Sequence, residues 1–466
     1  MVELREPLES LICHPSTFTR DTKFPRANEI RLYDTTLRDG EQTPGVAFTP
    51  QQKFDLACLL SDAGLHIIDM GFPSAALSER RALKLILDGK RQGRIRKDLE
   101  VLVMCRSNPR DIDVTLDTLE QMGAKPSDCT FFIFTSGSDL HLKYKIGRTL
   151  LGLEGRRPEE WLDLPVSFYR EANLRMATQA IAHARSRGVE EIEFGGEDGS
   201  RADVDYLIEL ARACYAAGGT RYSFPDTVGY FAPEGVDHYI PKLVAAFPDK
   251  PLVVHFHNDF GLGAYNTVRA LQHGATIPTC TVNGIGERAG NAPLHTTVMI
   301  LKELYGIEIP GFRYDLLWTL RRKVEEYSGL PVGPGEPIIG YNVFSHETGI
   351  HTAGITIHPA IYQVVEPEMV GGELRFLFGK HSGAMAIEAV LETHREELAA
   401  EGIEVSPRLV KLLLTLVKEV REKKALVSQH EDGIRNYYAH LDRLGLTEQD
   451  LLAYAIVLGR DLDAAV

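Results

Sequence analysis

Two histidines separated by a single residue are the strongest chemical feature of this 466-residue sequence. His255 and His257 lie in the short apolar run LVVHFHND, at residues 252–259. If this run is a β-strand, side chains two positions apart project from the same face, so both imidazoles would point together. Two imidazoles, a carboxylate and open coordination positions suit a divalent ion such as Zn, Mn, Fe or Co. The pair therefore indicates a metal site, and two hydrogen-bonded core histidines are the alternative.

Further polar residues end other apolar runs, and each has a chemical and a structural interpretation. Asp39 belongs to DTTLRDGEQ, at 34–42, and could add a carboxylate to the histidines. Glu197 is the second-last residue of EIEFGGED and could act as a general base, or form a helix cap or a salt bridge. Thr227 in PDTVG could serve the same site or only stabilise a turn. Arg106 could hold a substrate carboxylate or be an ordinary loop arginine.

Eight short β-rich runs alternate with amphipathic stretches, and this order decides how the polar residues come together. Alternating strands and helices predict a parallel sheet, and eight such repeats predict an α/β fold of the closed TIM (β/α)8 barrel type. The active site of such a barrel forms at the carboxyl ends of the strands, where these residues lie. An open doubly wound sheet is the alternative, but no GxGxxG follows the first run. The runs are residues 29–36, 66–73, 100–106, 130–137, 191–198, 221–229, 252–259 and 276–284.

The remaining segments depart from the barrel pattern. The long charged crossover at 138–172 is expected to be a surface excursion, with a mobile lid as the alternative. Residues 330–341, LPVGPGEPIIGY, are rich in Gly and Pro and predict a linker. The predicted organisation is an N-terminal extension (1–28), a catalytic barrel (29–329), a linker and small mixed subdomain (330–398) and a helical C-terminal region (399–466).

Composition and charge exclude several classes of protein. Apolar residues make up 44% and charged residues 25%, as in ordinary globular chains and unlike disordered or collagen-like ones. The 51 Lys and Arg against 65 Asp and Glu leave a net charge of −14 without a basic patch, so nucleic acid is not an expected partner. No apolar run suits a membrane span or a signal peptide, and the six cysteines are scattered. We expect a cytoplasmic protein with reduced thiols and no membrane partner.

Six motifs, in this order, resemble those of the 2-isopropylmalate synthase and homocitrate synthase family. This family condenses acyl-CoA with 2-oxo acids and belongs to the DRE-TIM metallolyase superfamily. The resemblance extends from about residue 29 to about residue 398. The cysteine-bearing loop of the related hydroxymethylglutaryl-CoA lyases is not found in GIGERAGN. The motifs are DTTLRDGEQTPG (34–45), PDTVGY (225–230), HFHNDFGLGAYNT (255–267), NGIGERAGNAPL (283–294), GIHTAG (349–354) and GKHSG (379–383).

The resemblance implies a divalent metal cofactor, Mg, Mn, Zn or Co, and acetyl-CoA as cosubstrate. Asp39, His255 and His257 correspond to protein ligands of the metal, with Asn291 of GERAGN as a fourth. The 2-oxo acid would chelate this metal through its keto and carboxylate oxygens. The implied reaction is a Claisen-type condensation that gives a 2-substituted malate and CoA.

The same resemblance implies roles for further residues. Arg38 would stabilise the oxyanion that develops on the keto oxygen, and Thr227 would bind the acceptor carboxylate. Glu197 and His351 would form the acid–base pair that removes a proton from acetyl-CoA, and Tyr362 would close the site. His351 and Tyr362 reach the barrel from the partner protomer in this family. The resemblance therefore implies a homodimer in which each subdomain completes the partner's site.

Departures from the family pattern leave the acceptor open. Family members that make isopropylmalate usually have HQDG where this sequence has HTAG at 351–354. Homocitrate synthases typically carry an arginine at the place of Glu193, which would repel 2-oxoglutarate. The short helical C-terminus also differs from the leucine-sensing domain of many relatives. 2-Oxoisovalerate is the first candidate; phenylpyruvate, phosphonopyruvate, oxaloacetate and pyruvate stay open, as do a lyase or aldolase reaction and a barrel that only binds.

Overall fold

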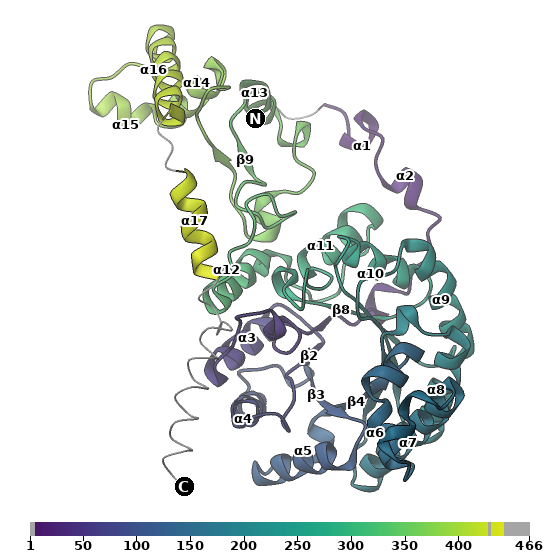
Figure 1. Cartoon of the computed structure of the whole chain (residues 1–466). Coiled ribbons are helices and arrows are strands. Elements are labelled where there is room, and N and C mark those ends of the chain that lie inside the picture. The colour runs from purple at the N-terminus through teal and green to yellow at the C-terminus, as the bar shows by residue number, and fades with distance from the viewer. Residues whose placement is uncertain (1–4, 427–429, 442–466) are drawn as a thin grey trace, which may run out of the picture. The chain divides into compact units, whose positions relative to one another are not determined.

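Eight short parallel strands close into a barrel in the computed structural model, which describes residues 5–426 and 430–441. β1 pairs with β2 on one side and β8 on the other, with Tyr33 opposite Ile67 and Thr279. A buried apolar cluster that includes Leu102 and Val253 fills the interior. The predicted TIM barrel is confirmed (Figure 1). The strands are β1 (Tyr33–Asp34), β2 (Ile67–Asp69), β3 (Glu100–Arg106), β4 (Thr130–Ser136), β5 (Ile192–Glu197), β6 (Arg221–Asp226), β7 (Leu252–Phe256) and β8 (Ile277–Cys280).

Helices follow the strands and cover the outside of the barrel (Figure 1). Local sequence fixes several of their starts. Thr49 accepts the backbone N–H of Gln52 at the head of α3, and Pro50 is its first helical residue. Asn108 caps α5 through the N–H of Asp111. The helices around the barrel are α3 (Pro50–Asp62), α4 (Leu77–Arg91), α5 (Pro109–Gln121), α7 (Val166–Ser186), α8 (Val204–Ala216), α9 (Pro233–Ala246), α10 (Gly263–Gln272) and α11 (Leu294–Met299).

Several strands end earlier than the apolar runs of the sequence suggested. β7 ends at Phe256, so the prediction that one strand carries both histidines is wrong for His257, which follows the strand. Because the neighbouring β8 ends at Cys280, the backbone beyond Phe256 has no strand beside it. His257 instead forms an isolated antiparallel bridge with Asn291. Thr227 likewise lies just beyond the end of β6.

The fourth crossover packs against the barrel and is more than a surface excursion. Leu142, Leu150 and Tyr169 are fully buried in one apolar cluster of this segment and α7. Lys145 reaches the mouth of the barrel. The segment contains a π-helical turn, η4 (His141–Lys145), the helix α6 (Gly147–Leu153) and a 3₁₀ turn, η5 (Pro158–Leu162).

The chain divides into two compact units. The barrel unit holds residues 18–313 and 320–329, and the second unit holds the described residues before 18, residues 314–319 and those from 330 onward. A parallel two-stranded sheet lies in the second unit, with Arg375 opposite Ser345. The other elements are α1 (Leu8–Leu11), α2 (Ser16–Thr19), α12 (Leu317–Ser328), β9 (Ser345–His346), α13 (Gly349–Ile357), β10 (Arg375–Phe376), α14 (Ala384–Thr393), α15 (Arg395–Ala400), α16 (Pro407–Leu426) and α17 (His430–Leu441).

Some sequence-based expectations about organisation stay predictions. Residues 442–466 of the expected helical C-terminal region lie outside the described residues. The boundaries expected at residues 28, 329 and 398 concern independent folding, which nothing in the structure measures. Among the described residues, no helix is both long and apolar enough to cross a bilayer.

Candidate active site

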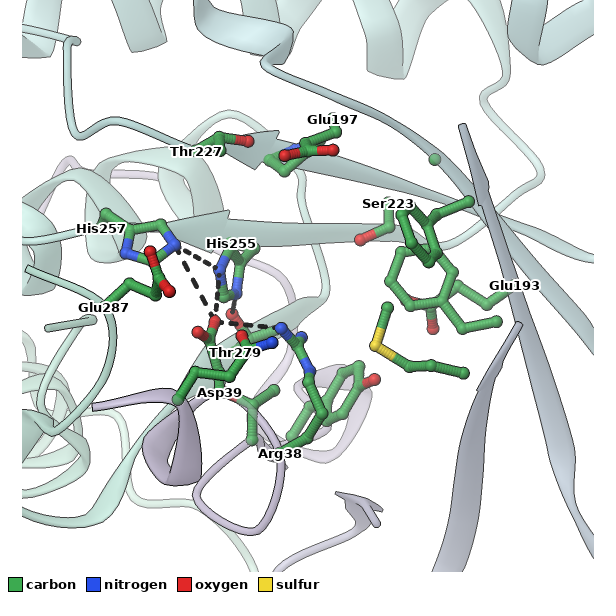
Figure 2. A pocket seen from close by; sticks show the side chains of 18 of the residues that line it. Arg38, Asp39, Glu193, Glu197, Ser223, Thr227, His255, His257, Thr279 and Glu287 are labelled. Atoms are coloured by element: carbon green, nitrogen blue, oxygen red, sulfur yellow. Dashed lines mark hydrogen bonds and ion pairs between the residues drawn. The ribbon is translucent and has the colours of Figure 1, made fainter. Parts of the chain in front are cut away.

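A cavity of about 330 Å³ opens at the carboxyl ends of the barrel strands (Figure 2). Reactive groups gather at this end of a TIM barrel because the βα loops and strand ends meet there. One side of the cavity is polar and the other is apolar. The sequence-predicted residues that line it are Arg38, Asp39, Glu197, Thr227, His255 and His257.

Asp39, His255 and His257 form a buried cluster in this cavity (Figure 2). Nε2 of His255 lies 3.1 Å from Oδ2 of Asp39 and 3.3 Å from Nε2 of His257. Nε2 of His257 lies 3.9 Å from the same carboxylate oxygen. One ligand atom from each side chain lies within 4.8 Å of the others, so a single ion could contact all three.

The outer contacts of the two histidines orient their rings. Nδ1 of His255 lies 2.8 Å from the Thr279 hydroxyl, and Nδ1 of His257 lies 3.2 Å from the carbonyl oxygen of Gly290. A carbonyl oxygen only accepts, so this contact places the hydrogen of His257 on Nδ1 and leaves a lone pair on Nε2. Burial, and then the neighbouring His255, lower the pKa of His257 to about 4. A neutral, oriented imidazole is the form that binds a metal.

Arg38 favours the ionised form of the Asp39 carboxylate. Its Nε donates to Oδ2 of Asp69 at 2.6 Å, and its Nη1 lies 3.3 Å from Oδ2 of Asp39. Burial on its own would raise the pKa of Asp39. The Arg38 guanidinium and the two histidines outweigh burial and lower that pKa below its usual value. The cluster therefore offers an anionic oxygen beside two imidazoles.

A buried lysine that the sequence did not reveal anchors the loop that carries Asp39. The ammonium group of Lys53 lies 2.6 Å from the carboxylates of both Glu41 and Glu79, and the lysine is only 1% exposed. Glu41 follows Asp39 by two residues, so this contact ties the loop to α3 and α4. The backbone N–H of Asp39 also donates to the carbonyl oxygen of Thr35 at 2.8 Å.

Asn291 presents a buried oxygen with no hydrogen-bond partner among the described residues. This atom is Oδ1, while Nδ2 donates to the carbonyl oxygen of Ile285 at 3.3 Å. Gly286 permits this arrangement, because a Cβ there would collide with Nδ2 of Asn291. A buried oxygen without a partner is costly unless another group satisfies it. Two imidazoles, a carboxylate and this amide oxygen fit the ligand preferences of a divalent transition metal.

Glu197 and Thr227 lie together at another edge of the cavity (Figure 2). Glu197 is the last residue of β5, and its carboxylate forms an ion pair with Lys145 of the fourth crossover. Oγ1 of Thr227 accepts the backbone N–H of Asp198 at 2.8 Å. The carbonyl oxygen of Thr227 accepts from Nη2 of Arg288 at 2.7 Å. The sequence did not reveal Lys145; the only signal was the positive charge of the segment HLKYK.

The opposite side of the cavity is apolar. The rings of Phe72 and Phe134 meet edge to face with centroids 5.9 Å apart, and Phe132 lies 6.2 Å from Phe134. Met104 of β3 adds a thioether to the same lining. None of these four side chains carries a charge or a strong hydrogen-bonding group, so they favour contact with an apolar group, although Ser223 and Glu193 lie beside them (Figure 2). The sequence did not reveal the set, because its members come from three separate repeats.

Glu193 lies at the cavity, and one of its carboxylate oxygens is paired, whereas Oε1 is buried without a hydrogen-bond partner among the described residues. Nε of Arg221 donates to its Oε2 at 2.6 Å, and Nη2 of the same arginine lies 2.7 Å from Oε1 of Glu100. Burial raises the pKa of Glu193, and the arginine opposes that effect. Arg221 is thus shared between two carboxylates.

The structure does not bring Arg106 to this cavity. Its guanidinium pairs with Asp111 through contacts of 2.6 and 2.9 Å, and its side chain is 66% exposed. Arg106 lines a second cavity of about 420 Å³, which lies among β3, β4, α6 and α7. The two cavities share Phe134, Lys145 and Glu197.

His351 and Tyr362 belong to the second compact unit. Their rings stack, with centroids 4.2 Å apart and an interplanar angle of 28°. Gly354 makes this contact possible, because a Cβ there would lie 2.6 Å from the tyrosine ring. The two residues therefore form an assembled pair, with His351 on α13 and Tyr362 41% exposed.

Known proteins match this chain over most of its length. Residues 29–152 and 164–316 match the HMGL-like family model, and residues 338–424 match the model of the homocitrate synthase post-HMGL domain-like family. A protein of Ignicoccus hospitalis named "Probable 2-isopropylmalate synthase" is 38% identical over 407 residues, which are 87% of this chain and 91% of that protein. Homocitrate synthase AksA of Methanopyrus kandleri is 36% identical over 411 residues, 88% of this chain and 92% of that protein.

A solved structure supports the fold. The hydroxymethylglutaryl-CoA lyase of Pseudomonas aeruginosa matches with a TM-score of 0.51 and 19% identity, over 66% of this chain and 96% of that chain. At this identity the likeness concerns the barrel alone. The family models and the relatives confirm the resemblance that the six motifs indicated. The chain is a member of the 2-isopropylmalate synthase and homocitrate synthase family of HMGL-like TIM-barrel enzymes.

Proposed function

We propose that this enzyme condenses acetyl-CoA with a 2-oxo acid that has an apolar side chain, in a reaction that depends on a divalent metal. One observation carries the proposal: the buried cluster of Asp39, His255 and His257 shares a cavity with the carboxylate of Glu197. A metal-type donor set beside a candidate base is what enolate formation and attack on a ketone require. The two relatives are named for products made from different acceptors, so the acceptor must be argued from the cavity.

The metal would be held by Asp39, His255 and His257, with the unpaired Oδ1 of Asn291 as a fourth ligand. A divalent ion bound there would polarise the keto oxygen of the acceptor as a Lewis acid. Imidazole and carboxylate ligands suit Zn, Mn and Co, and Mg is the alternative that prefers oxygen.

Arg38 and Thr227 would bind the acceptor. Arg38 is a partly buried cation, with its side chain 14% exposed, and it would stabilise the negative charge that develops on the keto oxygen. Thr227 accepts the N–H of Asp198, so its hydroxyl hydrogen is available to donate to the acceptor carboxylate.

Glu197 would remove a proton from the methyl group of acetyl-CoA. The methyl carbon would then bond to the keto carbon, and the keto oxygen would take a proton. Water would cleave the thioester and release CoA together with a 2-substituted malate. We also propose that His351 and Tyr362 of a second protomer complete this site in a homodimer; the half-exposed, preassembled pair supports that role.

The apolar side of the cavity favours an acceptor with an apolar side chain, and 2-oxoisovalerate is the first candidate. Cations that line the cavity already contact carboxylates: Arg38 contacts Asp69, and Arg288 contacts Asp259 at 2.8 Å. A second acidic group on the acceptor would lie against aromatic rings and Glu193. Burying a carboxylate without a partner is strongly unfavourable. Oxaloacetate, 2-oxoglutarate and phosphonopyruvate are therefore poor acceptors, and phenylpyruvate and pyruvate are the apolar alternatives.

The second cavity offers a place for acetyl-CoA. It meets the first cavity at Glu197 and Lys145, where the thioester must lie if Glu197 takes the methyl proton. Leu153 and Met176 give it apolar walls, which suit the pantetheine arm. Lys145, with its side chain 47% exposed, lies where the arm would enter.

Thiol release from acetyl-CoA tests the proposal. Purified full-length protein would be incubated with Mn²⁺ or Mg²⁺ and each of six acceptors: 2-oxoisovalerate, phenylpyruvate, pyruvate, oxaloacetate, 2-oxoglutarate and phosphonopyruvate. We expect kcat/KM to be highest with an acceptor of the apolar group and the signal to vanish on chelation. A preference for a charged acceptor would refute the assignment of the acceptor class. Silence with every acceptor would refute the condensation itself and favour the lyase reaction.

A further inference from the structure

Asp198, which directly follows Glu197, has the left-handed backbone conformation, with φ 68° and ψ 37°. Few residues other than glycine adopt this conformation, although aspartate and asparagine tolerate it best. Asp198 is also fully buried. Such a conformation persists only where surrounding contacts hold it, and it is found preferentially at functional sites.

The carboxylate of Asp198 makes the contacts that hold this turn. Oδ1 accepts from Nε of Arg201 at 2.7 Å, and Oδ2 accepts from the hydroxyl of Ser138. Nε2 of His141 lies 3.6 Å from the same Oδ2. Ser138 and His141 belong to the start of the fourth crossover, so one buried carboxylate joins the end of β5 to that segment.

The backbone of Asp198 orients the hydroxyl of Thr227. Its N–H donates to Oγ1 of Thr227 at 2.8 Å. A hydroxyl oxygen that accepts this bond still has its own hydrogen to donate. Thr227 lines the cavity and Asp198 does not, so the hydrogen is available on the cavity side. The direction of the N–H depends on the left-handed turn, and therefore on the carboxylate that holds it.

The same carboxylate affects Glu197 through the crossover. Lys145, which pairs with the carboxylate of Glu197, follows His141 by four residues within the turn η4. The backbone N–H of His141 also donates to the hydroxyl of Ser138 at 3.2 Å, and that hydroxyl donates to Asp198. The lysine that pairs with Glu197 thus belongs to a segment whose start is held by the carboxylate of Asp198.

We propose that Asp198 is a positioning residue for the reaction: its buried carboxylate holds the left-handed turn that directs the Thr227 hydroxyl and the Glu197 carboxylate into the cavity. The inference rests on the proposed function, because it takes the roles of Thr227 and Glu197 from there. Asp198 would touch neither substrate nor metal.

The test compares Asp198→Asn with a matched control, Asp237→Asn. Asparagine keeps the left-handed preference but not the charge. Asp237 also pairs with an arginine and a histidine, Arg269 at 2.6 Å and His273 at 2.7 Å, but it lies on α9 outside the cavity. We expect Asp198→Asn to lower kcat/KM for the acceptor about 10- to 100-fold, through both a higher KM and a lower kcat, as misplacement of reacting groups does. Asp237→Asn should change neither.

Two further measurements separate positioning from damage to the fold. The affinity for Mn²⁺, measured by calorimetry, should be unchanged in Asp198→Asn. The side chain of Asp198 does not contact the cluster of Asp39, His255 and His257. Asp198→Gly also tests the carboxylate, since glycine adopts the left-handed conformation freely. It should share the kinetic defect even though the strain is relieved. A glycine variant with full activity would overturn the proposal.

A double-mutant cycle with Thr227→Val tests whether Asp198 acts through Thr227. If it does, Asp198→Asn will raise the acceptor KM in the parent but not in the Thr227→Val background. Equal increases in both backgrounds would overturn the inference, as would kinetics indistinguishable from those of Asp237→Asn. These outcomes all require an active parent enzyme. An inactive parent would instead refute the proposed function, so the two failures are distinguishable.

Discussion

The polar and the apolar side of the barrel cavity hold their shapes by different means. On the polar side, Asp39, His255 and His257 lie within 4.8 Å of one another and are fixed by directional hydrogen bonds and ion pairs. On the apolar side, Phe132 and Phe134 make ring contacts alone. Directional bonds fix an atom to within tenths of an ångström, whereas ring packing fixes mainly the volume left free.

This difference suggests that one side of the cavity serves the chemical reaction and the other side selects the acceptor. The polar side contains the groups that would bind a metal and move a proton, and these needs are common to every 2-oxo acid. The apolar side would contact the part of the acceptor that varies. We therefore expect substitutions on the polar side to change the rate with all acceptors, and substitutions on the apolar side to change the ranking among them.

The largest effect is expected at the metal cluster. His257→Ala removes a proposed metal ligand, so it should abolish tight Mn²⁺ binding and lower kcat/KM at least about 10³-fold with every acceptor. Calorimetry and thiol release measure the two quantities. His183→Ala is the control, since that histidine pairs with Asp113 at 2.8 Å on the outer helix α7. Full metal binding in His257→Ala would contradict the assignment of this cluster.

Glu197 tests whether the polar side also holds the base. Glu197→Gln keeps the shape but removes proton acceptance, so kcat should fall about 10²- to 10⁴-fold while Mn²⁺ affinity is retained. Glu160→Gln, in the same region of the fold but paired with Arg157 at the surface, should be silent. Pre-steady-state exchange of the acetyl-CoA methyl protons with solvent would locate the loss at proton removal. Exchange at the parent rate would assign the base to another residue.

A change in the order of kcat/KM values among the acceptors tests the role of the apolar side. Phe132→Leu enlarges the apolar space and should shift the kcat/KM ratio of phenylpyruvate to 2-oxoisovalerate by about 10- to 100-fold, as contacts in hydrophobic pockets do. Phe131→Leu is a matched control on the same strand, fully buried but absent from the cavity lining. It should lower stability without changing the ratio. An unchanged ratio in Phe132→Leu would mean that acceptor choice is made elsewhere.

The sequence predicted the polar side far better than the apolar side. His255, His257 and Asp39 are recognisable because few residue types bind metals and because they lie at or beyond the carboxyl ends of strands, where a barrel places its site. His257 was wrongly expected inside the strand, but it still belongs to the cluster. An isolated bridge to Asn291 holds its backbone just beyond the end of β7. The barrel itself was predictable from eight repeats of strand and helix.

Phe72, Met104 and Phe132 could not be predicted in the same way. Apolar residues at strand positions are expected throughout the core, and nothing local distinguishes one that lines a cavity from one that fills the interior. Lys145 and Lys53 were hidden for a related reason. A lysine in a helical segment normally faces solvent, and only the fold shows that Lys53 lies between two carboxylates. Arg106 shows the converse, because Asp111 in the next helix satisfies its charge.

The smallest effect is expected at Glu193, which lies in the cavity lining although it is charged. Glu193→Gln would leave Arg221 in an ion pair with Glu100 alone and would remove a negative charge that would face the proposed acceptor. One partly screened charge is worth about 1 kcal/mol, so kcat/KM for 2-oxoglutarate should rise about fivefold. The value for 2-oxoisovalerate should change less, because an apolar side chain interacts weakly with either form. A rise confined to 2-oxoglutarate would show that the charge of Glu193 excludes acidic acceptors, whereas an equal rise with both acceptors would contradict that role. The first outcome is expected, since glutamate and glutamine have nearly the same size.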